Sequence, residues 1–351
     1  MAFDPAKGQL KCTHCGHTEG VPATTTSGIA SHLLEEFLAR AGDAHLKTLA
    51  EQALEVQCTG CGSVVSFQPP EVAGSCPFCG ANIVNQPKAA DPMVAPDAVL
   101  PFKVPKEQAQ TQVRTWLQTR WFAPNALKRM ASQEGIAGLY LPFWTYDADT
   151  VSNYTGQRGE HYFETETYEE DDGQGGTVTR TREVMRTAWY PTAGQVARSF
   201  QDVLIAASRA VPEKKLNHLA PWDLESICVY EPAYLAGFKA QRYQVELPDG
   251  FEEAKSVMAN VIDGDVRRDI GGDEQMVESV ETAYANSVFR HILLPLWIGA
   301  YRFRNQPYQV VVNARTGEVQ GDRPYSTVKI VFLVFGILCL IVVLYALMHH
   351  R

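Results

Sequence analysis

The sequence lacks the short motifs that mark the common catalytic sites. It contains no Gly-x-x-x-x-Gly-Lys-Ser/Thr phosphate loop, no Gly-x-Ser-x-Gly turn and no His-Glu-x-x-His pair. These absences argue against nucleotide hydrolases, serine hydrolases and zinc peptidases. The nearest approach to a catalytic set is Asp147 with Asp149, which would share one face of a strand and act as acid and base. We expect no enzyme and no small-molecule substrate, with chemistry at these carboxylates as the enzymatic alternative.

Basic residues are scarce as well. The chain of 351 residues has 31 Lys and Arg against 40 Asp and Glu, a formal net charge of −9. Between Thr48 and Pro87, where four of the cysteines lie, there is no Lys or Arg at all. Contacts to nucleic-acid phosphates depend on such side chains. We therefore expect this region not to bind nucleic acid.

Six of the eight cysteines form three pairs of one pattern. The pairs are Cys12-Thr-His-Cys15, Cys58-Thr-Gly-Cys61 and Cys76-Pro-Phe-Cys79, and a glycine follows each of them. A tight turn of this kind brings two thiolates to one metal ion. The second and third pairs are close enough in sequence to form a zinc ribbon. Four thiolates leave no open position, so we expect one structural Zn²⁺ at this site.

The first pair, Cys12 and Cys15, cannot complete a tetrahedral site alone. His17 is the first candidate for a third ligand, with His32 and His45 next. The alternative is that half of another ribbon has been lost or is encoded upstream of the assigned start. A second zinc site is therefore left open.

The apolar spacing predicts an α+β fold. Residues 28–55 suggest a helical hairpin, and further helices are expected at 106–120 and 251–263. Leu141-Pro-Phe-Trp144 and Leu294-Pro-Leu-Trp297 echo each other, which indicates two related helix-on-antiparallel-sheet units. The predicted parts are 1–55 (half knuckle and helical hairpin), 56–85 (zinc ribbon), 86–100 (Pro-rich linker), 101–326 (duplicated α+β domain) and 327–351 (anchor).

One long exposed hairpin is predicted around the turn 171–176. Strong alternation on both sides of this turn places Glu164 and Glu166 of the first arm toward Arg180 and Arg182 of the second. The hairpin is either a solvated flap or a docking arm.

The C-terminal run Ile330–Met348 carries no charge. As a helix it would be roughly 28 Å long, near the ~30 Å thickness of a bilayer core. No basic region followed by an apolar stretch opens the chain, which argues against a secretory signal. We expect a single C-terminal transmembrane helix in the bacterial inner membrane, with the bulk of the chain in the cytoplasm and the lipid bilayer as one partner.

Several longer motifs resemble one group of bacterial proteins. They include FDPAKGQLKCTHCG, CPFCGANIV, GLYLPFWTYD, PAYLAGFKAQRY, RHILLPLWIGAYRF and VVVNARTGEVQGDRPYSTVKI. Over nearly its whole length the chain is similar to membrane-anchored proteins with TFIIB-type zinc ribbons, often labelled as like the primosomal replication protein N prime. In that group another Cys-x-x-Cys usually precedes the segment matching Phe3–Leu10, and it is absent here.

The resemblance implies a scaffold rather than an enzyme. Some members of the group are implicated, with flotillin-like SPFH proteins and phage-shock protein A, in membrane-stress assemblies. Our leading hypothesis is a non-enzymatic, membrane-anchored adaptor whose zinc ribbon region recruits partner proteins. A nucleic-acid-associated replication accessory factor is the alternative, for which the ribbons are the sole argument.

Overall fold

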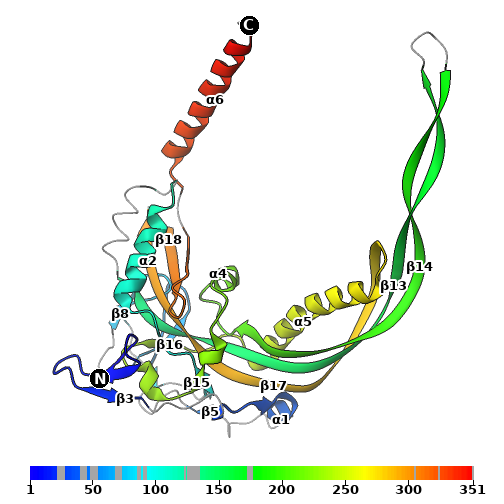
Figure 1. The fold of residues 1–351 in the computed structure, drawn as a ribbon. Coiled ribbons are helices and arrows are strands. Elements are labelled where there is room, and N and C mark those ends of the chain that lie inside the picture. Colours follow the sequence, from blue (N-terminus) through cyan, green and yellow to red (C-terminus); the bar gives the residue numbers. More distant parts are fainter. Residues whose placement is uncertain are drawn as a thin grey trace.

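Three long strands dominate the structure. The computed structural model describes the chain except at residues 22–27, 40–45, 48–53, 68–72, 85–87, 90–92, 122–123, 125–134, 172–176, 304–305, 323–324 and 350–351. The long strands are β13 (Ala137–Asp171), β14 (Thr177–Ala206) and β17 (Glu274–Phe303). Strand β13 is the middle one and pairs antiparallel with β14 on one edge and β17 on the other. Figure 1 shows these strands curving across the molecule.

Shorter strands complete a mixed sheet of 12 strands. They are β4 (His32–Leu33), β6 (Leu54–Gln57), β7 (Val64–Phe67), β10 (Lys88–Ala89), β12 (Ala98–Val99), β15 (Cys228–Val229), β16 (Lys239–Gln241), β18 (Gln306–Asn313) and β19 (Val319–Gly321). Small separate sheets contain β1 (Ala2–Asp4), β2 (Gln9–Lys11) and β3 (Thr18–Gly20), then β5 (Leu46–Lys47) with β11 (Met93–Val94), and β8 (Ala73–Ser75) with β9 (Asn82–Val84).

The predicted α+β class is wrong, because the described fold is mostly β. The α-helices are α1 (Leu34–Ala39), α2 (Lys106–Gln118), α4 (Glu213–His218), α5 (Leu247–Ile270) and α6 (Thr327–His349), with short 3-10 turns η3 (Leu224–Ser226) and η4 (Pro232–Leu235). Helices α2 and α5 lie where helices were predicted. The error lies in the strands, which run for 35, 30 and 30 residues in β13, β14 and β17, far beyond the hairpins expected from the sequence.

The helical hairpin predicted over 28–55 is also wrong. Only α1 is helical in the described part of this stretch, and it is flanked by strand β4, which pairs with β17. Phe37, one of the apolar residues behind the prediction, lies on the short helix α1, and its ring packs edge-on against Phe289 with the ring centres 5.0 Å apart. The end of the predicted linker is structured too: β12 pairs parallel with β17, and Val99 and Leu100 are fully buried.

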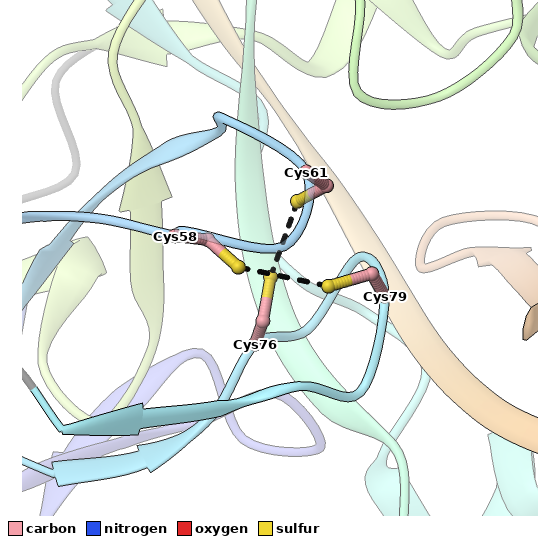
Figure 2. A group of neighbouring side chains, drawn as sticks. All are labelled: Cys58, Cys61, Cys76 and Cys79. Atoms are coloured by element: carbon pink, nitrogen blue, oxygen red, sulfur yellow. Dashed lines mark hydrogen bonds between the residues drawn. The ribbon is translucent and has the colours of Figure 1, made fainter.

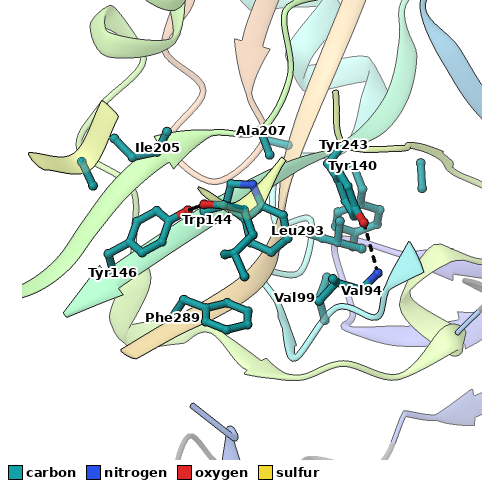
Figure 3. Packing of buried hydrophobic residues seen from close by; sticks show 14 of the residues in the cluster. Val94, Val99, Tyr140, Trp144, Tyr146, Ile205, Ala207, Tyr243, Phe289 and Leu293 are labelled. Carbon is teal, nitrogen blue, oxygen red and sulfur yellow. Dashed lines mark hydrogen bonds between the residues drawn. The ribbon is translucent and has the colours of Figure 1, made fainter. Parts of the chain in front are cut away.

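The central sheet is buried on both faces, so its strands alternate between two hydrophobic cores. On β17, Phe289, Leu293 and Trp297 belong to one core, whereas Ile292, Leu294 and Ile298 belong to the other. Period-two alternation in which both faces are apolar is typical of a covered sheet. Figure 3 shows the first core, in which Trp144 of β13 and Phe289 of β17 lie near each other, with their ring centres 6.0 Å apart.

The two Leu-Pro-x-Trp segments lie side by side and make equivalent contacts. Leu141 pairs with Leu294 across β13 and β17. The indole of Trp144 donates a hydrogen bond to the Val245 carbonyl, two residues before α5, at 2.9 Å. The indole of Trp297 donates to the Val104 carbonyl, two residues before α2, at 2.8 Å. Trp144 on β13 thus holds the start of α5, the helix that precedes β17. Trp297 on β17 in turn holds the start of α2, the helix that precedes β13.

Helix α5 buries one narrow stripe against the sheet. The stripe repeats every fourth residue and consists of Gly250, Ala254, Met258, Ile262, Val266 and Ile270. A Cβ at Gly250 would lie 2.5 Å from the hydroxyl oxygen of Tyr146, which is itself held at 2.8 Å from the Leu247 carbonyl. Gly250 therefore allows the helix to approach β13 this closely.

Two glycines of α5 should respond in opposite ways to alanine. Gly250→Ala should lower the free energy of unfolding by about 1–3 kcal/mol, because the buried Tyr146 ring cannot move aside. Gly264→Ala should raise it by about 0.5–1 kcal/mol, since a Cβ there has nothing within 4 Å and alanine favours the helix. Urea unfolding of both variants measures this. Stabilisation by both substitutions would show that α5 does not approach β13 so closely.

The outer ends of β13 and β14 form a long two-stranded arm, residues 160–171 and 177–188. The predicted hairpin is therefore present, and Figure 1 shows it leaving the body of the molecule at a place separate from α6. Glu166 pairs with Arg182 as predicted, at 3.1 Å. Glu164 pairs with Arg186 rather than with either predicted arginine, because directly opposite residues and their diagonal neighbours are both within reach.

The apolar C-terminal run forms one helix, α6, whose described apolar side chains are exposed. A membrane span requires about 20 predominantly apolar residues in a continuous helix. Within the residues that the structure describes, no helix combines the length and the hydropathy needed to cross a bilayer. The predicted transmembrane anchor at 327–351 and the single-pass inner-membrane location are therefore wrong.

Candidate metal centre

The three cysteine pairs adopt the same turn. In the second pair, the N–H of Gly62 donates to the Cys58 carbonyl at 2.8 Å, and in the third, that of Gly80 donates to the Cys76 carbonyl at 2.9 Å. Both glycines have positive φ, 74° and 69°. This left-handed conformation favours glycine because it has no Cβ, which explains why a glycine follows each pair.

Four sulfur atoms converge where the second and third turns meet. The ligand atoms of Cys58, Cys61, Cys76 and Cys79 all lie within 4.8 Å of one another. Figure 2 shows the four side chains pointing toward a common centre. The Sγ atoms of Cys58 and Cys79 are 3.6 Å apart, and those of Cys61 and Cys76 are 3.7 Å apart. Tetrahedral zinc with bonds of about 2.3 Å separates its sulfur ligands by about 3.8 Å, so the cluster can hold a metal ion of that size.

The electrostatics of the cluster differ from thiol to thiol. Burial opposes ionisation of Cys58, but the N–H groups of Gly60 and Cys61 outweigh it and hold the pKa of this thiol below its ordinary value. Burial raises the pKa of Cys76 strongly and that of Cys79 as well. Thiolates in such a setting need a cation among them.

The cluster is part of the main fold. Strand β7 pairs with β16 and thereby joins the ribbon to the sheet. Cys58, Cys76 and Phe78 are buried in the second hydrophobic core. The amide of Gln309, on β18, donates to the Phe78 carbonyl at 3.3 Å. Loss of the ribbon would therefore expose part of this second hydrophobic core.

The first pair remains a half site in the described part of the chain. Cys12 and Cys15 form the first turn, in which the N–H of Gly16 donates to the Cys12 carbonyl at 3.1 Å. Backbone N–H groups of Cys15 and His14 lower the pKa of Cys12 to about 7. Among the described residues, only the four-cysteine cluster gathers three or more metal-ligating side chains. Metal binding here stays a prediction.

The histidines proposed for the first site have different fates. His32 lies on β4, which pairs with β17, and its Nε2 atom forms a hydrogen bond with Asp97 Oδ1 at 2.7 Å. His17 belongs to the first turn, where its carbonyl accepts from Cys12 N at 2.8 Å. His45 lies outside the described residues.

Asp147 and Asp149 support two bulges rather than facing a common substrate. Asp147 Oδ1 accepts from the N–H of Asp202 at 2.7 Å, and Asp149 Oδ2 accepts from the Asn286 side chain at 2.9 Å. Asp202 and Asn286 have φ of 52° and 51°, at the points where β14 and β17 slip against β13. Bulges bend a strand and disrupt its ladder locally, so both carboxylates have a structural task.

A hollow of about 590 Å³ lies between α4, α5 and the end of β14. Its apolar lining includes Phe143, Trp222 and Val257, and the rings of Phe143 and Trp222 are 5.9 Å apart. Its polar lining includes Glu213 and the ion pair Arg209–Glu253. No local sequence pattern predicts this hollow, because its walls come from segments far apart in the chain.

Comparison with known proteins finds a distant relative. The chain is 26% identical over 340 residues to the uncharacterized protein YdjG of Bacillus subtilis (strain 168), covering 96% of this chain and 91% of that protein. No protein-family model matches. No solved structure matches either.

Proposed function

We propose that this chain is a non-enzymatic adaptor, in which a structural zinc ion braces the N-terminal region against a sheet platform that holds a partner protein. The closed cluster of four cysteines carries the proposal. Four thiolates fill the tetrahedron of a zinc ion, and a zinc ion without an open position stabilises a fold rather than activating water. The burial of Cys58 and Cys76 in the second hydrophobic core also supports a structural role for the metal ion.

The surroundings of the candidate acids also support a non-enzymatic role. Asp147 is engaged by the Asp202 backbone and by Arg290, at 2.7 and 2.5 Å. Asp149 and Asp147 are absent from the lining of the 590 Å³ hollow. A general acid or base must reach the proton that it transfers, and these two carboxylates are occupied at the bulges instead.

The hollow beside Trp222 is the proposed docking site for the partner. Its apolar floor suits one aliphatic or aromatic side chain of a protein segment. Among its charged lining residues, Glu213 and Glu253 outnumber Arg209, so a Lys or Arg beside that apolar side chain would be favoured. Flotillin-like SPFH proteins and phage-shock protein A-like proteins, which the family resemblance implies, are the partners to test first.

A photo-crosslinking residue on α5 tests this docking site. Residue 257 lines the hollow. We expect p-benzoylphenylalanine at this position to give a discrete crosslink to another protein when the full chain is expressed in the organism that naturally produces it. Position 261, one turn further along α5, is the matched control because Val257 and Val261 are similarly exposed, at 44% and 40%, and only Val257 lines the hollow.

Two outcomes would contradict the proposal. Equal labelling from positions 257 and 261 would indicate nonspecific contact with the helix surface. Crosslinks to nucleic acid from position 257 would favour the replication-factor alternative. The variant Trp222→Ala should weaken the expected crosslink about tenfold, since it removes the ring against which the partner's anchoring side chain would pack, and tenfold corresponds to about 1.4 kcal/mol.

A further inference from the structure

Both outer edges of the arm lack a described neighbouring strand. Pairing of β13 with β17 ends at Gly159 and Glu274, and the next amide, that of His161, donates to Asp273 Oδ2 at 2.7 Å. Beyond this point no described strand pairs with β13 except β14, and no described strand pairs with the outer edge of β14. Unpaired backbone groups in a row are a template for another strand.

The charges of the arm are segregated by strand. The β13 side carries five glutamates between residues 160 and 170, whereas the β14 side carries Arg180, Arg182 and Arg186 with one glutamate, Glu183. Ion pairs across the hairpin join Glu170 to Arg180 and Glu166 to Arg182. One edge of the arm is therefore acidic and the other is basic.

One face of the arm carries an exposed apolar pair. Phe163 and Met185 face each other directly across the hairpin and are 69% and 56% exposed. They lie at odd positions, so they alternate with the row that contains Glu164, Glu166 and Arg182. Side chains on one face of the arm can therefore contact side chains on the same face of a strand that is added at either edge.

We propose that arms of successive copies of this chain add edge to edge, with β14 of one copy antiparallel to β13 of the next, in the register of the hairpin itself. In this arrangement Arg182 lies between Glu166 of its own copy and Glu166 of the neighbour. The same register places Met185 beside the neighbour's Phe163 and continues the apolar row. A single register thus brings together the charged side chains on one face of the arm and the apolar side chains on the other.

The alternative pairings of two arms are disfavoured by charge. Two β13 edges would bring glutamates of both copies together, and two β14 edges would do the same with arginines, which is destabilising for directly opposed side chains. Pairing of unlike edges is head-to-tail, so each added copy leaves the same acidic and basic edges free. Such contacts produce rings or open arrays rather than a closed pair. This assembly goes beyond the proposed adaptor function and does not depend on the metal centre.

A zero-length crosslink between copies tests the register. Two pools of the full-length Arg182→Lys chain, one unlabelled and one labelled with ¹⁵N, are mixed in equal amounts in a nonionic detergent that covers the exposed apolar helix α6. Carbodiimide then joins lysines to neighbouring carboxylates. We expect Lys–Glu166 crosslinked peptides with one light and one heavy half. Arg198→Lys is the matched control, because Arg198 contacts Asp265 of its own chain at 2.8 Å and its crosslinks should carry one isotope only.

Charge reversal separates this assembly from chance association. Arg182→Glu with Arg186→Glu makes both edges acidic, and Glu164→Arg with Glu166→Arg makes both edges basic. Each variant alone should lower the association measured by sedimentation velocity about tenfold or more, and mixing the two should restore it. Lys–Glu166 crosslinks within a chain are expected in any case, because Glu166 lies opposite residue 182 in the hairpin. A complete lack of mixed-isotope Lys–Glu166 crosslinks, or equal association of all the chains, would overturn the proposal. Retained circular dichroism of the variants excludes unfolding of the platform.

Discussion

Cys58→Ser is expected to reduce bound zinc from close to one ion per purified chain to nearly none. The apparent free energy of binding to structural zinc sites is about 10–16 kcal/mol at neutral pH, and most of the folding energy of a small ribbon comes from it. Serine keeps the size of the side chain but removes the thiolate. Elemental analysis of the purified chains measures the loss directly.

The structural effect of Cys58→Ser should reach beyond the ribbon. Strand β7 pairs with β16 at Val65 and Gln241, and Val65 is fully buried. Hydrogen exchange should therefore accelerate in β6 and β7 and also in β16, while α5, which lies elsewhere on the sheet, keeps its protection. Unchanged exchange in β16 would mean that the platform holds its shape without the metal.

Cys12→Ser is the matched control for the metal count. It removes a thiolate from the same kind of turn, but the described residues offer Cys12 and Cys15 no further ligands. We expect the zinc content to stay close to one ion per chain. If the unaltered protein held two zinc ions and Cys12→Ser removed one, the first pair would have recruited other ligands, with His17 the first to test by His17→Ala.

The cysteine turns were predictable because their causes are local. Two thiols separated by two residues, followed by a glycine, fix the turn within six residues, and positive φ at Gly62 and Gly80 bears this out. The helix at α2 and the hairpin of the arm follow equally local patterns. Each of these elements can be derived from spacing and turn chemistry alone.

The features that escaped prediction depend on distant partners. Asp147 and Asp149 looked like a possible acid and base, yet their partners at the bulges, Asp202 and Asn286, lie far along the chain. The apolar spacing around His32 suggested a helix, whereas pairing of β4 with β17 makes it a strand. Tertiary contacts override local propensity in such places.

Burial of a titratable ring at the centre of the sheet has a consequence for acid stability. His291 on β17 is fully buried, and its Nδ1 donates to the Val94 carbonyl at 2.8 Å. Its ring packs 4.8 Å from Trp144. Burial lowers the pKa of His291 from 6.5 to about 4, because a charged imidazolium would lose its hydration there.

Unfolding should therefore become easier as the pH falls from 7 to 5. In this range the unfolded chain binds a proton at His291 that the folded chain cannot bind, so the folded state loses stability as acid is added. The difference between pKa values of 6.5 and about 4 corresponds to a loss of about 2 kcal/mol by pH 5. Urea unfolding at the two pH values measures it.

His291→Asn isolates this contribution. Asparagine can keep a side-chain N–H near the Val94 carbonyl but does not titrate, so the variant should lose about 2 kcal/mol less than the unaltered chain between pH 7 and 5. Both chains share the zinc ribbon, so acid release of metal cancels in the comparison. Asp97, whose pKa is raised by burial, acts in the opposite direction, and stopping at pH 5 limits its share. Equal pH slopes for the two chains would mean that His291 already gains its proton in the folded state, and that the core around Trp144 admits water.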